Sequence, residues 1–382
     1  MKVLTAFGTR PEAIKLAPVV KALITQANRV VSRICVTAQH RGMLDQVLGL
    51  FSIHPDHDLN VMVNGQSPMD VVARVMDRFE PVLRAERPDW VLVQGDTTTT
   101  MATALAACYW GAKVGHIEAG LRTFDKRRPF PEEINRVVTT SVSDLHFAPT
   151  SLARTNLLCE SVDESRVLVT GNPGIDALFQ ILSTLDGPME NDPLNDVPEN
   201  QRIILATAHR RENFGRPLEN ICQALLDIAD RYLNDVRIIY PVHPNSNVYE
   251  VAHRILGSAR NVMLLEPLDY RKLIHVMRHS DIVLTDSGGI QEEAPTLGKP
   301  VLIMREVTER PEGVDAGAAL LVGTNRERIV EETIQLLDDL DAYEEMARPM
   351  NLYGDGYASS RIVAALLNET VEEWLPEAQR AN

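Results

Sequence analysis

What the sequence lacks already excludes several kinds of protein. No apolar run approaches the roughly 20 residues that a membrane-spanning helix needs. The N-terminus carries one lysine and then a strand-like segment, which differs from the charged and apolar regions of a secretory signal. We therefore expect a cytoplasmic protein that has no membrane partner.

Cysteine is scarce and widely spaced. Cys35, Cys108, Cys159 and Cys222 form no CxxC pair and no regular pattern. Such spacing favours buried free thiols over disulfides, and it does not match a zinc site.

Positive charge is also scarce. The formal net charge is −15, and no basic stripe offsets it, which argues against a nucleic-acid partner. A phosphorylated ligand is still compatible with this charge, provided that the few cations are concentrated locally.

What is present is the pattern of a parallel sheet wrapped in helices. The 382 residues are 45% hydrophobic and 24% charged, an ordinary globular composition with enough chain for two cores. Short apolar runs alternate with amphipathic segments, such as the helix expected at Pro11–Gln26. In the first half we expect strands at Lys2–Phe7, Val31–Val36, Asp89–Gln94, Lys113–Ile117, Leu145–Ala148 and Arg166–Thr170.

A second series follows residues 185–200, a Pro-, Asp- and Asn-rich stretch that we interpret as a surface linker or loop. The fold class is therefore α/β, with two Rossmann-like, doubly wound domains facing across a cleft that holds the ligand. The expected domains are 1–172, together with a C-terminal helix at 363–382 that crosses back, and 173–362. The second set of strands is expected at Arg202–Ala206, Arg237–Tyr240, Val262–Leu265, Asp281–Thr285 and Pro300–Met304.

Polar residues that directly follow strands are the best candidates for chemistry. In the first half these are Arg10 with Lys15 on the next helix, Asp96, and Glu118, and Glu132 opens a later helix. Each also has a structural interpretation: Arg10 as a solvated turn residue, Asp96 as a helix cap, Glu118 as a partner of Arg122, and Glu132 as a first-turn acid. Together, Asp96, Glu118 and Glu132 predict a carboxylate cluster that divides acid and base roles.

The second half carries candidate anion-binding residues. His209, Arg210 and Arg211 follow a strand and could hold a diphosphate or form a salt-bridge network; His243 has a similar position. A strand followed by Ser287, Gly288, Gly289 and a helix predicts a phosphate cradle, with Glu293 available for ribose hydroxyls and Arg310 downstream. We expect no metal, and without GxGxxG no dinucleotide cofactor.

These clusters resemble the motifs of the non-hydrolysing bacterial UDP-N-acetylglucosamine 2-epimerases. The resemblance runs from Lys2 to about Arg361. It implies the two-Rossmann architecture of GT-B glycosyltransferases, a homodimer, and interconversion of UDP-GlcNAc and UDP-ManNAc, which supplies ManNAc for cell-surface polysaccharide, without a cofactor. The motifs occur in the order GTRPEAIK, TAQHRGMLDQ, GDTTTT, HIEAGLRT, PEEINR, AHRREN, YPVHPN, DSGGIQEEAP, GKPVL and TERPE.

The resemblance also implies a mechanism. UDP is eliminated to give 2-acetamidoglucal and is then added back with the C2 proton on the opposite face. Asp96, Glu118 and Glu132 match the acid and base residues, with Asp96 favoured as a base, and His209 matches a residue near the leaving diphosphate. The implied UDP and sugar contacts are Arg10, Lys15, Arg136, Ser287, Gly288, Gly289, Glu293 and Arg310.

A second UDP-GlcNAc bound as an activator is implied by Gln39, His40, Arg211 and His243, although the sequence departs from the family at Gly42 and at residues 67–69. An epimerase of a modified sugar, such as UDP-2,3-diacetamido-glucuronate, shares nearly all of these motifs. A GT-B glycosyltransferase and a catalytically silent sugar-nucleotide sensor are the alternatives from other classes.

Overall fold

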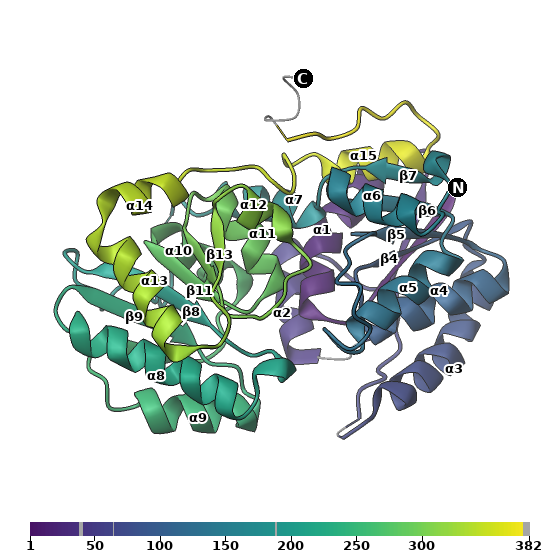
Figure 1. Cartoon of the computed structure of the whole chain (residues 1–382). Coiled ribbons are helices and arrows are strands. Elements are labelled where there is room, and N and C mark those ends of the chain that lie inside the picture. Colours follow the sequence, from purple (N-terminus) through teal and green to yellow (C-terminus); the bar gives the residue numbers. More distant parts are fainter. Residues whose placement is uncertain (38–40, 64, 188, 377–382) are drawn as a thin grey trace. The chain divides into compact units, whose positions relative to one another are not determined.

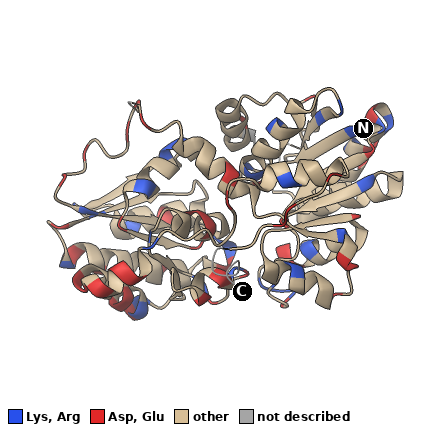
Figure 2. Ribbon diagram, turned by 90° about the horizontal axis from the view of Figure 1, so that it is seen from above, with Lys and Arg blue, Asp and Glu red and all other residues tan. Residues whose placement is uncertain are grey.

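The chain folds into two compact α/β units, each built on its own parallel sheet (Figure 1). The computed structural model describes residues 1–37, 41–63, 65–187 and 189–376. Unit 1 comprises Met1–Phe179 and the chain from Tyr353 onward, and unit 2 comprises Gln180–Leu352. Lys and Arg residues are interspersed with Asp and Glu over both units (Figure 2).

Unit 1 contains a seven-stranded sheet in the order β3-β2-β1-β4-β5-β6-β7, and all its strand pairs are parallel. The order reverses between β1 and β4, where a doubly wound sheet binds its ligands beyond the strands' carboxyl ends. The strands are β1 (Lys2–Phe7), β2 (Val31–Val36), β3 (His57–Asp58), β4 (Trp90–Gln94), β5 (Lys113–Ile117), β6 (Leu145–Ala148) and β7 (Val167–Val169). The helices are α1 (Arg10–Thr25), α2 (Arg41–Phe51), α3 (Pro68–Glu86), α4 (Thr98–Trp110), α5 (Glu132–Val142), α6 (Ser151–Cys159), α7 (Pro173–Leu182) and α15 (Ala358–Leu366).

Unit 2 repeats this plan with six parallel strands in the order β10-β9-β8-β11-β12-β13. Its switch point lies between β8 and β11. The strands are β8 (Arg202–Thr207), β9 (Val236–Pro241), β10 (Val262–Leu265), β11 (Ile282–Thr285), β12 (Val301–Ile303) and β13 (Ala319–Leu321). The helices are α8 (Arg216–Arg231), α9 (Ser246–Leu256), α10 (Tyr270–His279), α11 (Gly288–Thr296), α12 (Pro311–Asp315), α13 (Arg326–Asp338) and α14 (Leu340–Met346).

Local sequence signals explain where the site-bearing helices begin. Thr9 and Glu12 form a reciprocal capping box at the start of α1, and Pro11 occupies its first turn. Thr97 caps α4 by accepting a hydrogen bond from the backbone of Thr100. The alternative interpretation of Asp96 as the cap of this helix is therefore wrong, and its side chain makes another contact, with Arg136.

The C-terminal segment belongs to unit 1, because α15 packs against α1 and its first turn is tied to α7. Asp176 accepts hydrogen bonds from the backbone N–H groups of Ala358 and Ser359, at 3.1 and 2.8 Å. The compact units therefore divide at 179 and 353, where the sequence placed boundaries after 172 and 362. The helix expected over 363–382 also differs: α15 ends at Leu366, and residues 369–376 follow as irregular chain.

The α/β class and the two doubly wound sheets are confirmed, and the predicted strands are present with ends shifted by a residue or two. The short strands β3 and β13 were not predicted. All four cysteines are free thiols, but Cys108 and Cys159 are exposed, so the expectation of burial holds for only two of them. None of the helices within the described ranges combines the length and apolar character that crossing a bilayer requires.

Candidate active site

Glu118 directly follows β5 and is a buried acid of unit 1. Its backbone has a φ of 64°, an unusual conformation for a residue other than glycine, and its side chain is 4% exposed. Lys15 and Gln94 donate short hydrogen bonds to the two carboxylate oxygens, and Asn172 donates a third at 2.8 Å. The carboxylate is therefore held in one orientation by three donors from different elements.

Asp96, which follows β4, is held by Arg136 on α5. The Arg136 guanidinium donates to Asp96 at 2.5 Å and to the buried Glu133 at 2.8 Å, while Asn135 donates to the Asp96 carbonyl at 2.9 Å. Because the Asp96 side chain is 29% exposed, it is far more accessible than that of Glu118. The two predicted acids thus share a cation-lined end of one sheet and differ in access.

The structure settles one of the alternatives left open by the sequence. Arg122 pairs with Glu160 through two hydrogen bonds, at 2.6 and 2.8 Å, and not with Glu118. Glu132 begins α5 and Arg10 begins α1, and both side chains are half-buried. These two residues remain candidates for the active site because each is the first residue of a helix.

Glu12 is a buried acid that organises the loops without being a chemical candidate. Its carboxylate accepts hydrogen bonds from the backbone of Gly8 and Thr9 and from the hydroxyls of Thr97 and Thr100, at 2.7–3.0 Å. Burial raises the pKa of Glu12, and these hydrogen bonds oppose that shift. The turns after β1 and β4 are therefore locked together by one side chain.

In unit 2, Asp286 organises the loop that carries His209. Asp286 is completely buried, and one carboxylate oxygen accepts hydrogen bonds from the backbone N–H groups of His209 and Arg210, both at 2.8 Å, and from Asn213 at 3.0 Å. The other oxygen lies 3.3 Å from Nδ1 of His209. The ring of His209 stacks on that of His243, with centroids 5.6 Å apart.

The turn Ser287-Gly288-Gly289 opens α11 as predicted, and its two glycines have different surroundings. A Cβ on Gly288 would lie 2.7 Å from a guanidinium nitrogen of Arg310, so this position has no room for a side chain. A Cβ on Gly289 would meet no protein atom within 4 Å. Since no neighbouring group of the chain requires a glycine at 289, close approach of a ligand is a reason for it.

Arg310 lies beneath this turn in a buried ion network. It donates to Glu292 and Glu309, both at 2.5 Å, and Glu309 is shared with the fully buried Arg305 at 2.9 Å. The positive charge of Arg310, which the sequence predicts to bind phosphate, is therefore already compensated by two carboxylates. In the structure, the Arg310 guanidinium lies against Gly288 and supports the glycine turn.

The remaining candidates are placed as follows. Glu293 is buried and accepts a hydrogen bond from the Tyr270 hydroxyl at 2.7 Å, and Arg211 is exposed in the 3-10 turn Arg211–Asn213. Gln39 and His40 lie outside the described residues. Among the described residues, no three His, Cys, Asp or Glu side chains gather in a way that could hold a metal ion.

The family model described as UDP-N-acetylglucosamine 2-epimerase matches residues 22–367. The chain belongs to this family. Among curated members of the UDP-N-acetylglucosamine 2-epimerase family, the Escherichia coli K12 enzyme is 52% identical over 379 residues, covering 97% of this chain and all of the relative. The putative enzyme of Thermotoga maritima is 50% identical and covers 97% of both chains.

Solved structures of UDP-N-acetylglucosamine 2-epimerases have the same fold as this chain. The Neisseria meningitidis enzyme bound to UDP-GlcNAc is 48% identical with a TM-score of 0.93, covering 97% of this chain and 100% of that one. The Methanocaldococcus jannaschii enzyme in complex with UDP-GlcNAc and UDP is 34% identical with a TM-score of 0.86, covering 96% and 100%. A Rickettsia africae glycosyltransferase at 15% identity and a TM-score of 0.59 shows a shared fold alone.

Several supporting residues were missed at the sequence level, although a signal for them existed. Gln94 ends β4, Asn172 lies shortly after β7, and Asp286 directly follows β11. Polar residues at strand ends were the criterion that found Asp96 and Glu118, and it applied equally to these three. Their partners are distant in sequence, such as Lys15 and Glu118, which are 103 residues apart.

Proposed function

We propose that this chain interconverts UDP-GlcNAc and UDP-ManNAc, as an isomerase of the cytoplasm, by elimination and re-addition of UDP. The observation that carries the proposal is the pair of acids at one end of the unit 1 sheet, Glu118 and Asp96, each bound to a cation, in a chain 52% identical to a curated epimerase over nearly its full length. Glu132 completes the set at the start of α5.

The chemistry explains why several acids are needed. The hydrogen at C2 of the sugar has no adjacent carbonyl, so simple deprotonation is unfavourable. Anti elimination couples loss of that proton to departure of UDP from C1 and gives 2-acetamidoglucal. Re-addition of UDP with proton delivery to the opposite face inverts C2. The path needs a base on one face and an acid on the other.

Access suggests how the acids divide this work. Asp96 is the more exposed, which supports its assignment as a base that reaches C2. Glu118, enclosed by Lys15 and two amides, is suited to act in one fixed orientation. Lys15 and Arg136 contribute to the sugar chemistry by fixing the orientation of these acids. The family resemblance also implies that these two residues and Arg10 contact the substrate.

Unit 2 is proposed to hold UDP. The backbone N–H groups at the start of α11 and the Ser287 hydroxyl would donate hydrogen bonds to the diphosphate oxygens, with His209 beside the leaving oxygen. Glu293, already bound to Tyr270, is positioned as an acceptor for ribose hydroxyls. Arg310 contributes positive charge through the turn that it supports, and its Nε and one Nη already donate to Glu292 and Glu309.

Proton NMR of the purified protein with UDP-GlcNAc, without added cofactor, tests the proposal. The expected result is a UDP-ManNAc C1 signal that grows to a constant ratio from either substrate. Turnover only of UDP-2,3-diacetamido-glucuronate would assign the modified-sugar alternative. UDP release that requires an added acceptor would assign a glycosyltransferase, and UDP binding without any conversion would assign a sensor.

A second UDP-GlcNAc is proposed as an activator, in contact with Arg211 and His243 and with Gln39 and His40. The M. jannaschii relative was solved with both UDP-GlcNAc and UDP, so two nucleotide ligands have precedent in that protein. A sigmoidal rate curve for UDP-ManNAc that becomes hyperbolic on adding a trace of UDP-GlcNAc is expected. Arg211→Ala should keep the maximal rate and lose the response.

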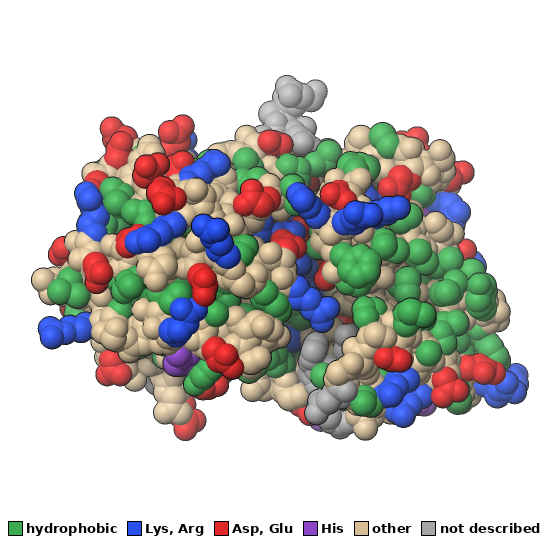
Figure 3. Space-filling model, turned by 60° about the horizontal axis from the view of Figure 1, so that its bottom comes forward, with side chains coloured by type: hydrophobic (Ala, Val, Ile, Leu, Met, Phe, Trp, Pro, Cys, Tyr) green, Lys and Arg blue, Asp and Glu red, His purple; other side chains and the backbone are tan. Residues whose placement is uncertain are grey.

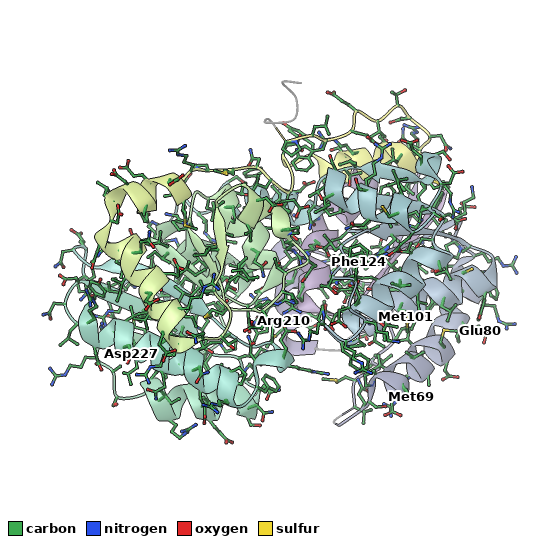
Figure 4. All side chains as sticks on the ribbon, in the orientation of Figure 1. Met69, Glu80, Met101, Phe124, Arg210 and Asp227 are labelled. Carbon is green, nitrogen blue, oxygen red and sulfur yellow. The ribbon has the colours of Figure 1, made fainter. Side chains whose placement is uncertain are left out.

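The proposed homodimer would use a face of unit 1 formed by α4 and α5. Helix α4 has no charged residue and exposes Tyr109, and the adjacent α5 exposes Ile134 and Val137. Apolar side chains gather on this unit in Figure 3, and Figure 4 labels two of its methionines, Met101 on α4 and Met69 on α3. Two chains that each carry −15 repel one another least through an uncharged face, which favours a second copy as its partner.

Sedimentation equilibrium tests this face. Tyr109 is 77% exposed, so Tyr109→Glu should fold normally and shift the chain from dimer to monomer. The matched control is Leu340→Glu on α14, where an exposed apolar residue stands in unit 2. A wild-type monomer, or equal effects of both substitutions, would contradict the assignment.

A further inference from the structure

The Asp286 carboxylate is satisfied on one side only. Its Oδ2 atom accepts three hydrogen bonds, from the backbone of His209 and Arg210 and from Asn213. Its Oδ1 atom is buried and accepts no hydrogen bond from the described residues, although Nδ1 of His209 lies 3.3 Å away. A buried carboxylate oxygen without a donor is costly, so this geometry favours a proton on the nitrogen that faces it.

The Asp286 carboxylate therefore contacts both the backbone and the ring of His209. Oδ2 fixes the main chain of the residue, and Oδ1 faces its ring. These two contacts restrict the side-chain torsion angles of His209, because its backbone and its ring cannot move independently of Asp286. The Tyr240 hydroxyl adds to the restraint on the loop by donating to the carbonyl of Ala208 at 2.9 Å.

The plane of the ring is set by His243. The two imidazoles are stacked with 13° between their planes. Nδ1 of His243 accepts a hydrogen bond from the backbone N–H of Asn245 at 3.2 Å, so the neutral ring of His243 carries its proton on Nε2. A neutral ring stacked on His209 does not oppose a positive charge there. His209 thus has its backbone, ring nitrogen and ring plane all defined.

We propose that Asp286 is a positioning residue that keeps a proton on Nδ1 of His209 and so directs Nε2 of that ring to the diphosphate. The role at the diphosphate rests on the proposed function, whereas the protonation of Nδ1 does not. When the C1–O bond breaks, its electron pair stays on the departing diphosphate oxygen, and Nε2–H of the imidazolium donates to that oxygen. Re-addition reverses both movements, and the Asp286 carboxylate stabilises the imidazolium throughout.

Asp286→Asn is the informative substitution. The amide oxygen can still accept from the backbone of His209 and Arg210, but the amide NH2 replaces the acceptor opposite Nδ1. Nδ1 must then act as an acceptor, and the proton of the neutral ring moves to Nε2. Nitrogen-15 NMR of the histidine-labelled chain above pH 8 reports this change directly. We expect Nδ1–H in the wild type and Nε2–H in the variant.

Kinetics provide the second readout. Because the amide no longer stabilises the imidazolium of His209, kcat should fall by at least about 100-fold, with a much smaller change in KM, as when the acid that orients a catalytic histidine is changed to its amide. The control is Asn213→Ala, which removes a donor to Oδ2 but leaves the contact with Nδ1. It should reduce thermal stability while His209 keeps its proton on Nδ1.

The outcomes separate the two claims. A wild-type ring with its proton on Nε2, or an Asp286→Asn variant with unchanged tautomer and kcat, would overturn the role of Asp286. Should Asp286→Asn fail to fold, the wild-type spectrum alone still decides the tautomer. Nδ1–H in a wild-type chain that does not convert UDP-GlcNAc would support the role of Asp286 and reject the proposed function.

Discussion

The two units share one topology but neutralise charge in opposite ways at their switch points. In unit 1, candidate acids are held by basic residues: Lys15 binds Glu118, and Arg136 binds Asp96. In unit 2, buried acids compensate the basic residue, since Glu292 and Glu309 enclose Arg310. One fold thus presents carboxylates at one sheet and backbone N–H groups at the other.

This difference suggests which groups perform each task. Proton transfer needs ionisable side chains with fixed orientation, and unit 1 supplies them with cations as supports. Anion binding at a helix N-terminus uses main-chain donors, so unit 2 needs cations mainly to shape the turn that presents them. Changing a supporting cation should therefore affect chemistry in unit 1 and stability in unit 2.

The largest effect is expected for Glu118→Gln. The amide keeps the size of the side chain and removes its charge and basicity. Epimerisation should fall by about 10³-fold or more, within the range for loss of an acid–base group. Calorimetric titration with UDP should show a much smaller effect on affinity, because most of the inferred UDP contacts belong to unit 2. A Glu118→Gln variant with near wild-type turnover would remove this residue from the acid–base set.

Arg310→Met should act on folding. The substitution leaves Glu292 and Glu309 buried without the shared cation, apart from Arg305 on Glu309. Breaking a buried pair in this way costs about 3–5 kcal/mol of unfolding free energy. Urea unfolding followed by circular dichroism measures it. Wild-type stability combined with lost UDP binding would instead make Arg310 a direct ligand contact.

Acid should weaken unit 1 through two buried histidines on neighbouring strands, His116 and His146. Burial lowers the pKa of His116 to about 4 and that of His146 to about 3, from an ordinary 6.5. Between the ordinary and folded values the unfolded chain binds the proton and the folded chain does not, so stability is lost as pH falls below 6.5. From pH 7 to pH 5 each should cost about 2 kcal/mol.

The His146→Leu variant isolates half of this effect. No hydrogen bond to its ring nitrogen Nδ1 is lost, because that atom has no partner among the described residues. Urea unfolding at pH 7 and pH 5 should show a pH dependence smaller by about 2 kcal/mol than in the wild type. An unchanged dependence would mean that His146 is not the group that titrates.

The glycine pair gives the smallest and most selective effect. Gly289→Ala meets no protein atom and should leave the melting temperature unchanged or slightly raised, while UDP affinity falls by about tenfold. Gly288→Ala contacts Arg310 and should lower both. Differential scanning fluorimetry and calorimetric titration separate the two variants. Equal UDP affinity of Gly289→Ala and the wild type would place UDP away from this turn.

The sequence predicts the strands and the polar residues that follow them because both depend on local pattern. Asp96, Glu118, His209 and Ser287 could be found in this way. The partners of these residues could not be found from the sequence. In the pairs Lys15–Glu118 and Asp96–Arg136 the two residues are far apart along the chain, and several other charged residues could have served as partners. Arg122 illustrates this: Glu118 was near in sequence, but Glu160 is its partner. The strand β3 was missed because two residues show no periodicity.

The central claim is that C2 is inverted through an eliminated intermediate, and turnover of UDP-GlcNAc in deuterium oxide tests it most directly. Mass spectrometry and proton NMR of both nucleotides measure the hydrogen at C2. We predict that every product molecule, and progressively the substrate, carries solvent deuterium at C2, and that Asp96→Asn and Glu118→Gln abolish the exchange. UDP-ManNAc that retains its C2 hydrogen would contradict the mechanism.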